Sequence, residues 1–148
     1  MMATEITDLY QDTILRHSRA PLHAEALDPF DAEAAGDNPM CGDRCTIRLQ
    51  FGADGSVARA GFQARGCAIS LASADMMADV IRGRAPADIR ALAAAFNTLV
   101  RTGHGAASVA PLQALSGVAE YPSRIKCATL PWAALIAALD GAGEASSE

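Results

Sequence analysis

The feature that most constrains the fold is a run of alternating residues that begins at Cys45. Polar residues at 46, 48 and 50 alternate with four apolar ones: Cys45, Ile47, Leu49 and Phe51. This two-residue period is typical of a strand with one buried face. A turn sequence follows at residues 52–55, and the alternation then resumes with Ala58, Ala60, Phe62 and Ala64 on one face until Gly66. The sequence therefore predicts two antiparallel strands.

Segments with helical periodicity precede and follow these strands in the sequence. Apolar residues at 6, 9, 10 and 14 predict an amphipathic helix from Ile6 to His17. After Gly66, one apolar stripe predicts a helix that ends near Gly83, and another predicts a helix that begins at Pro86. A short apolar segment follows the break at residues 102–105. We expect the last helix to begin around Thr129 to Pro131, because proline suits a first helical turn.

The order of these elements predicts an α+β domain. Residues 20–40 contain three prolines and few strand formers, which predicts a loop with one short edge strand around Phe30. We therefore expect a small antiparallel three-stranded sheet covered on one face by four to five helices. Nothing divides the chain, so residues 1–148 are expected to form a single domain with a disordered tail from about residue 141.

Composition excludes several classes of function. The net charge is −5 and the pI is near 5.1, whereas nucleic-acid binding requires clustered Lys and Arg. The first residues, MMATEITDLYQD, lack the pattern of a secretion signal, and the apolar stretches are shorter than a span of about 20 residues. We therefore expect a cytoplasmic protein without membrane or nucleic-acid partners. In a reducing compartment, the four cysteines favour metal binding or thiol chemistry over disulfides.

Three of the cysteines are expected at turns or at junctions between a strand and a helix. Cys41 stands two residues before Asp43 in the turn ahead of the first strand, where Pro39 stiffens the approach and Gly42 permits a sharp bend. Cys67 lies between a strand and a helix, and the helix N-terminus favours its thiolate. Cys127 is expected in the loop before the last helix. Three thiolates and one carboxylate would suit a tetrahedral zinc or iron site.

These motifs also resemble a known family. The stretches NPMCGDR, RGCAISLASADMM and YPSRIKCATLPW, in this order, resemble the U-type iron–sulfur cluster assembly proteins, the family of IscU, SufU and the NifU N-terminal domain. The resemblance covers nearly the whole chain and implies their fold. Lys126 stands where the IscU-like branch has a histidine, and the longer segment GRAPADIRALAAAFNTLVRTGHG resembles that of the SufU-like branch.

The resemblance implies a chemistry for each of these residues. Cys41, Asp43, Cys67 and Cys127 would bind Zn²⁺, and Cys41 would accept persulfide sulfur from a pyridoxal-phosphate cysteine desulfurase of the SufS type, for use by downstream iron–sulfur assembly proteins. Zinc keeps its thiols deprotonated but weakens them as nucleophiles. The hypothesis is therefore that Cys41 leaves the metal when the desulfurase docks, aided by Gly42.

Other interpretations of these residues stay open at this stage. The same residues could instead hold a [2Fe–2S] cluster on a scaffold, or a purely structural zinc in an adaptor protein. The cysteines could be unrelated buried thiols, and Asp43 could cap its own turn. Arg124 and Lys126 could lower the pKa of Cys127, contact an acidic partner or be solvated.

Residues outside these motifs are expected to have simpler roles. Strand alternation makes Cys45 a core thiol, with a spare ligand or resolving thiol as the alternative. The three histidines are expected at the surface: His17, His23 and His104.

Overall fold

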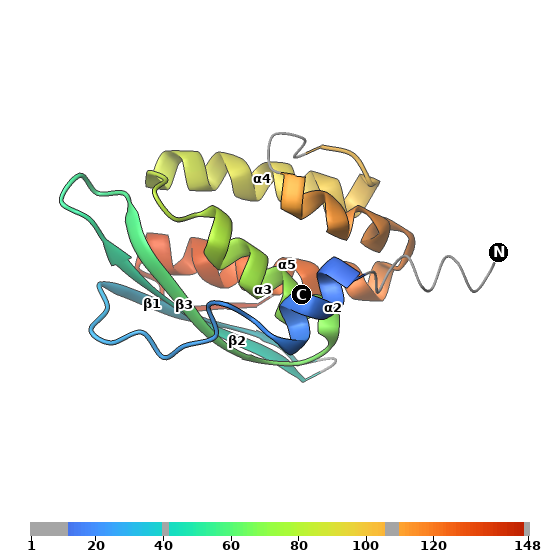
Figure 1. Cartoon of the computed structure of the whole chain (residues 1–148), viewed down its shortest axis with the longest axis horizontal. Helices are drawn as coiled ribbons and strands as arrows, with labels where there is room; N and C mark the ends of the chain where they lie inside the picture. The colour runs from blue at the N-terminus through green and yellow to red at the C-terminus, as the bar shows by residue number, and fades with distance from the viewer. Residues whose placement is uncertain (1–11, 40–41, 106–109, 147–148) are drawn as a thin grey trace.

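The computed structural model describes residues 12–39, 42–105 and 110–146 (Figure 1). Its elements, in chain order, are α2 (Asp12–Arg19), β1 (Ala32–Asn38), β2 (Asp43–Phe51), β3 (Val57–Arg65), α3 (Ala68–Val80), α4 (Pro86–Thr102), the 3₁₀ helix η1 (Ala110–Glu120), α5 (Pro122–Asp140) and β4 (Glu144–Ser146).

The strands form one sheet with the order β3-β2-β1-β4. The pairs β1–β2 and β2–β3 are antiparallel, which confirms the expected α+β class and its three-stranded antiparallel sheet. The strand β4 adds to this sheet, parallel to β1, within the tail that the sequence predicts to be disordered. Gly141, with φ of 71°, ends α5 and turns the chain back, so that the Gly143 carbonyl accepts a hydrogen bond from the Ala35 N–H (2.9 Å).

The helices lie in layers on one face of the sheet. Figure 1 shows the strands along the lower side of the view and α4 at the top, with α3 and α5 between them. Helix α5 packs on β1 and β2, α3 packs on β3, and α4 packs on η1 and α5. The predicted inward residues Cys45, Ile47 and Leu49 of β2 are buried, and Phe51 is half-buried. The strand begins two residues earlier than expected, so that Asp43 belongs to it and is buried on the same face.

The strand β1 differs from the expected short edge strand around Phe30. It spans Ala32–Asn38, begins two residues after Phe30, and lies between β2 and β4. Its composition is AEAAGDN, and Ala, Gly, Asp and Asn are all poor strand formers. This segment therefore forms a strand because it packs against α5. Such a tertiary contact cannot be recognised from the strand propensities of the residues.

The return strand β3 contains an irregularity that the alternation did not predict. Gln50 pairs with Arg59 whereas Phe51 pairs with Val57, so Ala58 is the extra residue of a bulge. Val57 is therefore buried and Ala58 is exposed, contrary to the expected inward position of Ala58.

Helix α5 begins seven residues earlier than the sequence predicts. Pro122, rather than Pro131, occupies its first turn, and Pro131 lies inside the helix. Because Pro131 has no N–H, the carbonyl of Cys127 receives no hydrogen bond from the position four residues on. Of the expected first helix, the structure describes α2, with Ile14 buried, while Ile6, Leu9 and Tyr10 lie outside the described residues.

Two of the histidines are interior contacts rather than surface residues. Asp75, in the middle of α3, is fully buried and lies 2.6 Å from His17 Nδ1 of α2. Its other oxygen accepts the backbone N–H of His23 (2.9 Å), and His23 Nε2 lies 3.0 Å from Asp79. These contacts join α2 and the following loop to α3. The expectation of surface positions was wrong for these two and is confirmed for His104, which is exposed.

Among the described helices, none combines the length and the apolar character that crossing a membrane requires.

A close approach between α5 and β1 generates a first prediction. A Cβ built on Gly36 would lie 3.0 Å from Leu130 Cδ1, 3.2 Å from the Leu130 carbonyl oxygen and 3.3 Å from Ala134 Cβ. Gly36→Ala should therefore lower the free energy of unfolding in chemical denaturation by about 1–3 kcal/mol, the usual effect of overpacking. Gly117→Ala is the control, because its Cβ would meet nothing within 4 Å. Equal stability of the two variants would contradict this account of the packing.

Candidate metal centre

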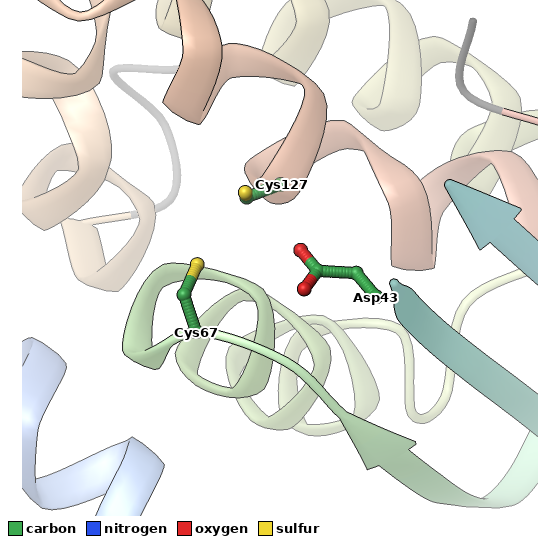
Figure 2. Close-up of side chains that lie close together, drawn as sticks. All are labelled: Asp43, Cys67 and Cys127. Atoms are coloured by element: carbon green, nitrogen blue, oxygen red, sulfur yellow. The ribbon is translucent and has the colours of Figure 1, made fainter. Parts of the chain in front are cut away.

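Three of the predicted ligands, from three different elements, meet at one end of the sheet. Figure 2 shows the carboxylate of Asp43 and the thiols of Cys67 and Cys127 directed toward a common point. Their ligand atoms all lie within 4.8 Å of one another. The residues are 24 and 60 positions apart in sequence, at the start of β2, at the start of α3 and within α5.

Asp43 is the most constrained member of this cluster. It is the first residue of β2, and strand alternation directs it to the helix-covered face together with Cys45. The residue is 3% exposed, and its Oδ2 has no hydrogen-bond partner among the residues that the structure describes. Leaving a buried charged acceptor unsatisfied costs more than the roughly 1–3 kcal/mol of a neutral group. This is not the geometry of a carboxylate that caps its own turn, whereas a bound cation would satisfy it.

Cys67 occupies the N-cap position of α3, as its place between strand and helix predicts. The hydrogen bond from the Cys127 thiol lowers the pKa of Cys67 to about 6, with further help from the backbone N–H groups of Ser70 and Ile69. Burial and the Asp43 charge act in the opposite direction. Cys67 is therefore the thiol of the pair that ionises first.

Cys127 lies inside α5, not in a loop before it, because the helix begins at Pro122. Its hydrogen bond to the Cys67 sulfur raises its pKa, and burial and Asp43 raise that pKa further. The Cys127 thiol, whose sulfur also lies 3.7 Å from the Ser123 carbonyl oxygen, therefore keeps its proton more strongly than Cys67 does. Metal binding to thiols displaces such protons, so the cluster would exchange a proton for a cation.

Gly66 provides the space for this arrangement, a role that the sequence reasoning missed. Its φ is +149°, and a Cβ at this position would collide with the carboxylate of Asp43. Both the backbone conformation and the close approach therefore require glycine. The only signal in the sequence was a glycine directly before Cys67.

The turn between β1 and β2 is described at both of its ends. Asn38 pairs with Asp43, and the N–H of Gly42 donates to the Asn38 carbonyl (2.9 Å). Gly42 has φ of 76°, as a sharp bend requires, and a Cβ there would meet nothing within 4 Å. The predicted ligand and nucleophile Cys41 lies outside the described residues.

The two helices that carry the thiols are joined directly. The Ser73 hydroxyl of α3 donates to the carbonyl of Ala128 in α5 (2.6 Å), and both groups are buried. Since Ala128 follows Cys127, this hydrogen bond fixes the distance between the helix segments that carry the two thiols.

The donor set fits a zinc ion. Two thiolates and a carboxylate are ligands that zinc takes in tetrahedral sites, with zinc–sulfur distances of about 2.3 Å. Ligand atoms around such an ion lie about 3.8 Å apart, so the cluster, whose atoms lie within 4.8 Å, needs only a small contraction. A fourth ligand would complete the set, and Cys41 is the predicted one.

The remaining candidate residues separate into two groups. Cys45 is fully buried, and burial raises its pKa to about 12, so the expected core thiol is confirmed. Arg124 and Lys126 lie in the first turns of α5, three residues and one residue before Cys127, the first half-buried and the second exposed.

Replacing Gly66 tests the geometry around Asp43. In Gly66→Ala, the new methyl group displaces the carboxylate, and we expect zinc affinity, measured by titration against a competing chelator, to fall by about 10–100-fold. Gly83→Ala is the matched control, because Gly83 also has positive φ (81°) but its Cβ would meet nothing within 4 Å. Equal affinity in both variants would show that the Gly66–Asp43 contact is unimportant.

The low pKa of Cys67 predicts a pH profile for the metal-free protein. Because the thiolate is the reactive form, the rate of Cys67 alkylation by iodoacetamide should be half-maximal near the pKa of about 6 and level above it. Peptide mass spectrometry would assign the rate to Cys67. The guanidinium-unfolded chain is the control and should show the ordinary midpoint of about 8.5. A folded-state rate that still rises through about pH 8.5 would contradict the assignment.

Comparison with known proteins gives these motifs a family. Residues 9–128 match the model of the NifU-like N terminal domain. The chain is 35% identical over 137 residues to the iron–sulfur cluster assembly scaffold protein IscU of Streptococcus pyogenes serotype M1, covering 91% of this chain and 85% of the relative. It is 36% identical over 130 residues to the zinc-dependent sulfurtransferase SufU of Bacillus subtilis (strain 168), covering 86% of each.

A solved structure shares the fold. The putative iron–sulfur cluster assembly scaffold protein for the SUF system from Fervidobacterium islandicum AW-1 superposes with a TM-score of 0.83 at 26% identity, over 90% of this chain and 98% of that one. The three motifs, the fold and these relatives agree, and the chain belongs to the family of the NifU-like N terminal domain.

Proposed function

We propose that this protein acts in iron–sulfur cluster assembly as a zinc-dependent sulfur acceptor, as the name of its Bacillus subtilis relative suggests. The observation that carries the proposal is the buried carboxylate of Asp43. Its Oδ2 has no hydrogen-bond partner in the described part of the chain, and its ligand oxygen lies within 4.8 Å of two thiol sulfurs. The sulfur donor is a pyridoxal-phosphate cysteine desulfurase of the SufS type, and Cys41 is the acceptor.

Zinc, when bound, supplies a Lewis acid that keeps the thiols of the site deprotonated near neutral pH. Asp43, Cys67 and Cys127 hold it from rigid elements. Cys41 precedes Gly42, whose conformational freedom lets the turn present the acceptor sulfur to a partner.

The transfer itself requires no net oxidation. The Cys41 thiolate attacks the outer sulfur of the donor's cysteine persulfide, a new sulfur–sulfur bond forms, and the old one breaks. The donor leaves as a thiolate, and Cys41 carries the persulfide. Downstream iron–sulfur assembly proteins then receive this sulfur.

A second candidate function is a scaffold on which a [2Fe–2S] cluster forms at the same residues. The 35% identity to the Streptococcus pyogenes scaffold protein favours it, and thiolates are the usual ligands of such clusters. Lys126 favours the acceptor, because the IscU-like branch has a histidine, a possible cluster ligand, at this position.

Metal content and desulfurase stimulation, measured together, test the proposal. We expect the protein purified without added metal to contain one zinc ion per chain and to accelerate cysteine turnover by a SufS-type desulfurase. Cys41→Ala should abolish the acceleration, because it removes the acceptor sulfur. Cys45→Ala is the control: Cys45 is buried outside the cluster, so zinc content and acceleration should persist. Bound iron with a visible cluster and no acceleration would establish the scaffold instead.

A further inference from the structure

The face of the sheet opposite the helices is half covered by the chain itself. The loop between α2 and β1 crosses it at Gly61, where a Cβ would lie 2.8 Å from the Glu25 carbonyl oxygen and 3.2 Å from Leu27 Cβ. Arg59 pairs with Glu25 (2.6 Å), and Gln50 donates to the Pro29 carbonyl (2.6 Å). These contacts cover the half of the face that lies farthest from the metal centre.

The other half of this face presents two arginines side by side. Arg44 of β2 and Arg65 of β3 are direct cross-strand partners, and Thr46 and Gln63 form the next pair on the same face. The four residues, with Ala64, line a shallow hollow of about 260 Å³. Four of its five lining residues are polar or charged, and the hollow is open to solvent.

Like charges placed directly opposite each other destabilise a sheet unless something compensates them. On the covered half of this face, the charge of Arg48 is compensated by Glu33, whose carboxylate lies 2.6 Å away. Among the described carboxylates, Arg44 pairs with Asp37 alone, at 3.9 Å, and both side chains are more than two-fifths exposed. Arg65 is exposed and has no carboxylate partner in the same part of the chain. The two arginines thus share one long, exposed ion pair and form a local positive patch on a chain of net charge −5.

The pair also adjoins the metal centre. Arg44 follows Asp43, and Gly66 alone separates Arg65 from Cys67. Alternation directs Asp43 toward the helices and Arg44 toward the open face, so the thiol cluster and the arginines lie at the same end of the sheet. A protein that reaches the cluster around this end would meet both arginines.

We propose that the surface formed by Arg44, Thr46, Gln63 and Arg65 binds an acidic segment of the sulfur-donor protein during transfer, an inference that rests on the proposed function. Carboxylates of that segment neutralise the arginine pair, and Thr46 and Gln63 provide polar contacts between them. The arginines act in recognition and orientation, not in the transfer chemistry, because they face away from the thiol cluster.

Charge reversal tests this surface in the zinc-loaded protein. Binding of a SufS-type desulfurase, measured by calorimetry without cysteine, should weaken about tenfold or more in Arg44→Glu/Arg65→Glu, and the affinity should lose most of its dependence on salt. Arg82→Glu/Arg101→Glu is the matched control, because both residues are exposed, the charge change is the same and neither adjoins the cluster. Zinc content and melting temperature, measured on every variant, show whether the metal site and the fold are intact. If the charge-reversed variant does not fold, Arg44→Gln/Arg65→Gln is tested in its place.

The outcomes separate the two proposals. Wild-type affinity and salt dependence in the Arg44/Arg65 variant would overturn the docking surface and leave the proposed function standing. Equal weakening in the Arg82/Arg101 control would also overturn it, because net charge alone would then explain the effect. An unchanged protein that neither binds nor stimulates the desulfurase would overturn the proposed function and this inference together.

Discussion

The buried carboxylate of Asp43 is the constraint on which the rest of the centre depends. Its position on the helix-covered face follows from strand alternation, and one of its oxygens has no hydrogen-bond partner within residues 12–39, 42–105 and 110–146. The thiolate of Cys67 adds a second negative charge nearby, and Asp43 opposes its ionisation. A folded protein keeps such a cluster when a ligand compensates it, and a divalent cation compensates both charges at once.

The surrounding fold holds the three candidate ligands Asp43, Cys67 and Cys127 on packed elements. Gly36 lets α5 approach β1 closely, and the Ser73–Ala128 hydrogen bond fixes α5 against α3. The two thiols and the carboxylate are therefore set by packed elements, which favours precise metal geometry. At Gly42, the next residue before Asp43, a Cβ would meet nothing within 4 Å, so packing does not restrict this position as it restricts Gly36 and Gly66.

The parts of this structure that local patterns encode were predictable from the sequence. The hairpin of β2 and β3, the start of α4 at Pro86 and the core position of Cys45 all follow from periodicity or from proline placement. The strand β1 was not predictable, because its small residues form a strand only when they pack against α5. The start of α5 was misplaced because Pro122 and Pro131 both suit a first turn, and only packing selects between them.

The candidate site was predictable as a set of residues but not as a geometry. The motifs identified Asp43, Cys67 and Cys127, yet the role of Gly66 depends on a contact that only the folded chain shows. In the paired register of β2 and β3, residue 43 faces the helices and residue 44 faces the open side of the sheet. A slip by one residue would exchange these faces, directing Arg44 into the core and the carboxylate into solvent. The register of one hairpin therefore determines both the candidate metal centre and the proposed docking surface, because the register that pairs Arg44 with Arg65 also places Asp43 beside Gly66.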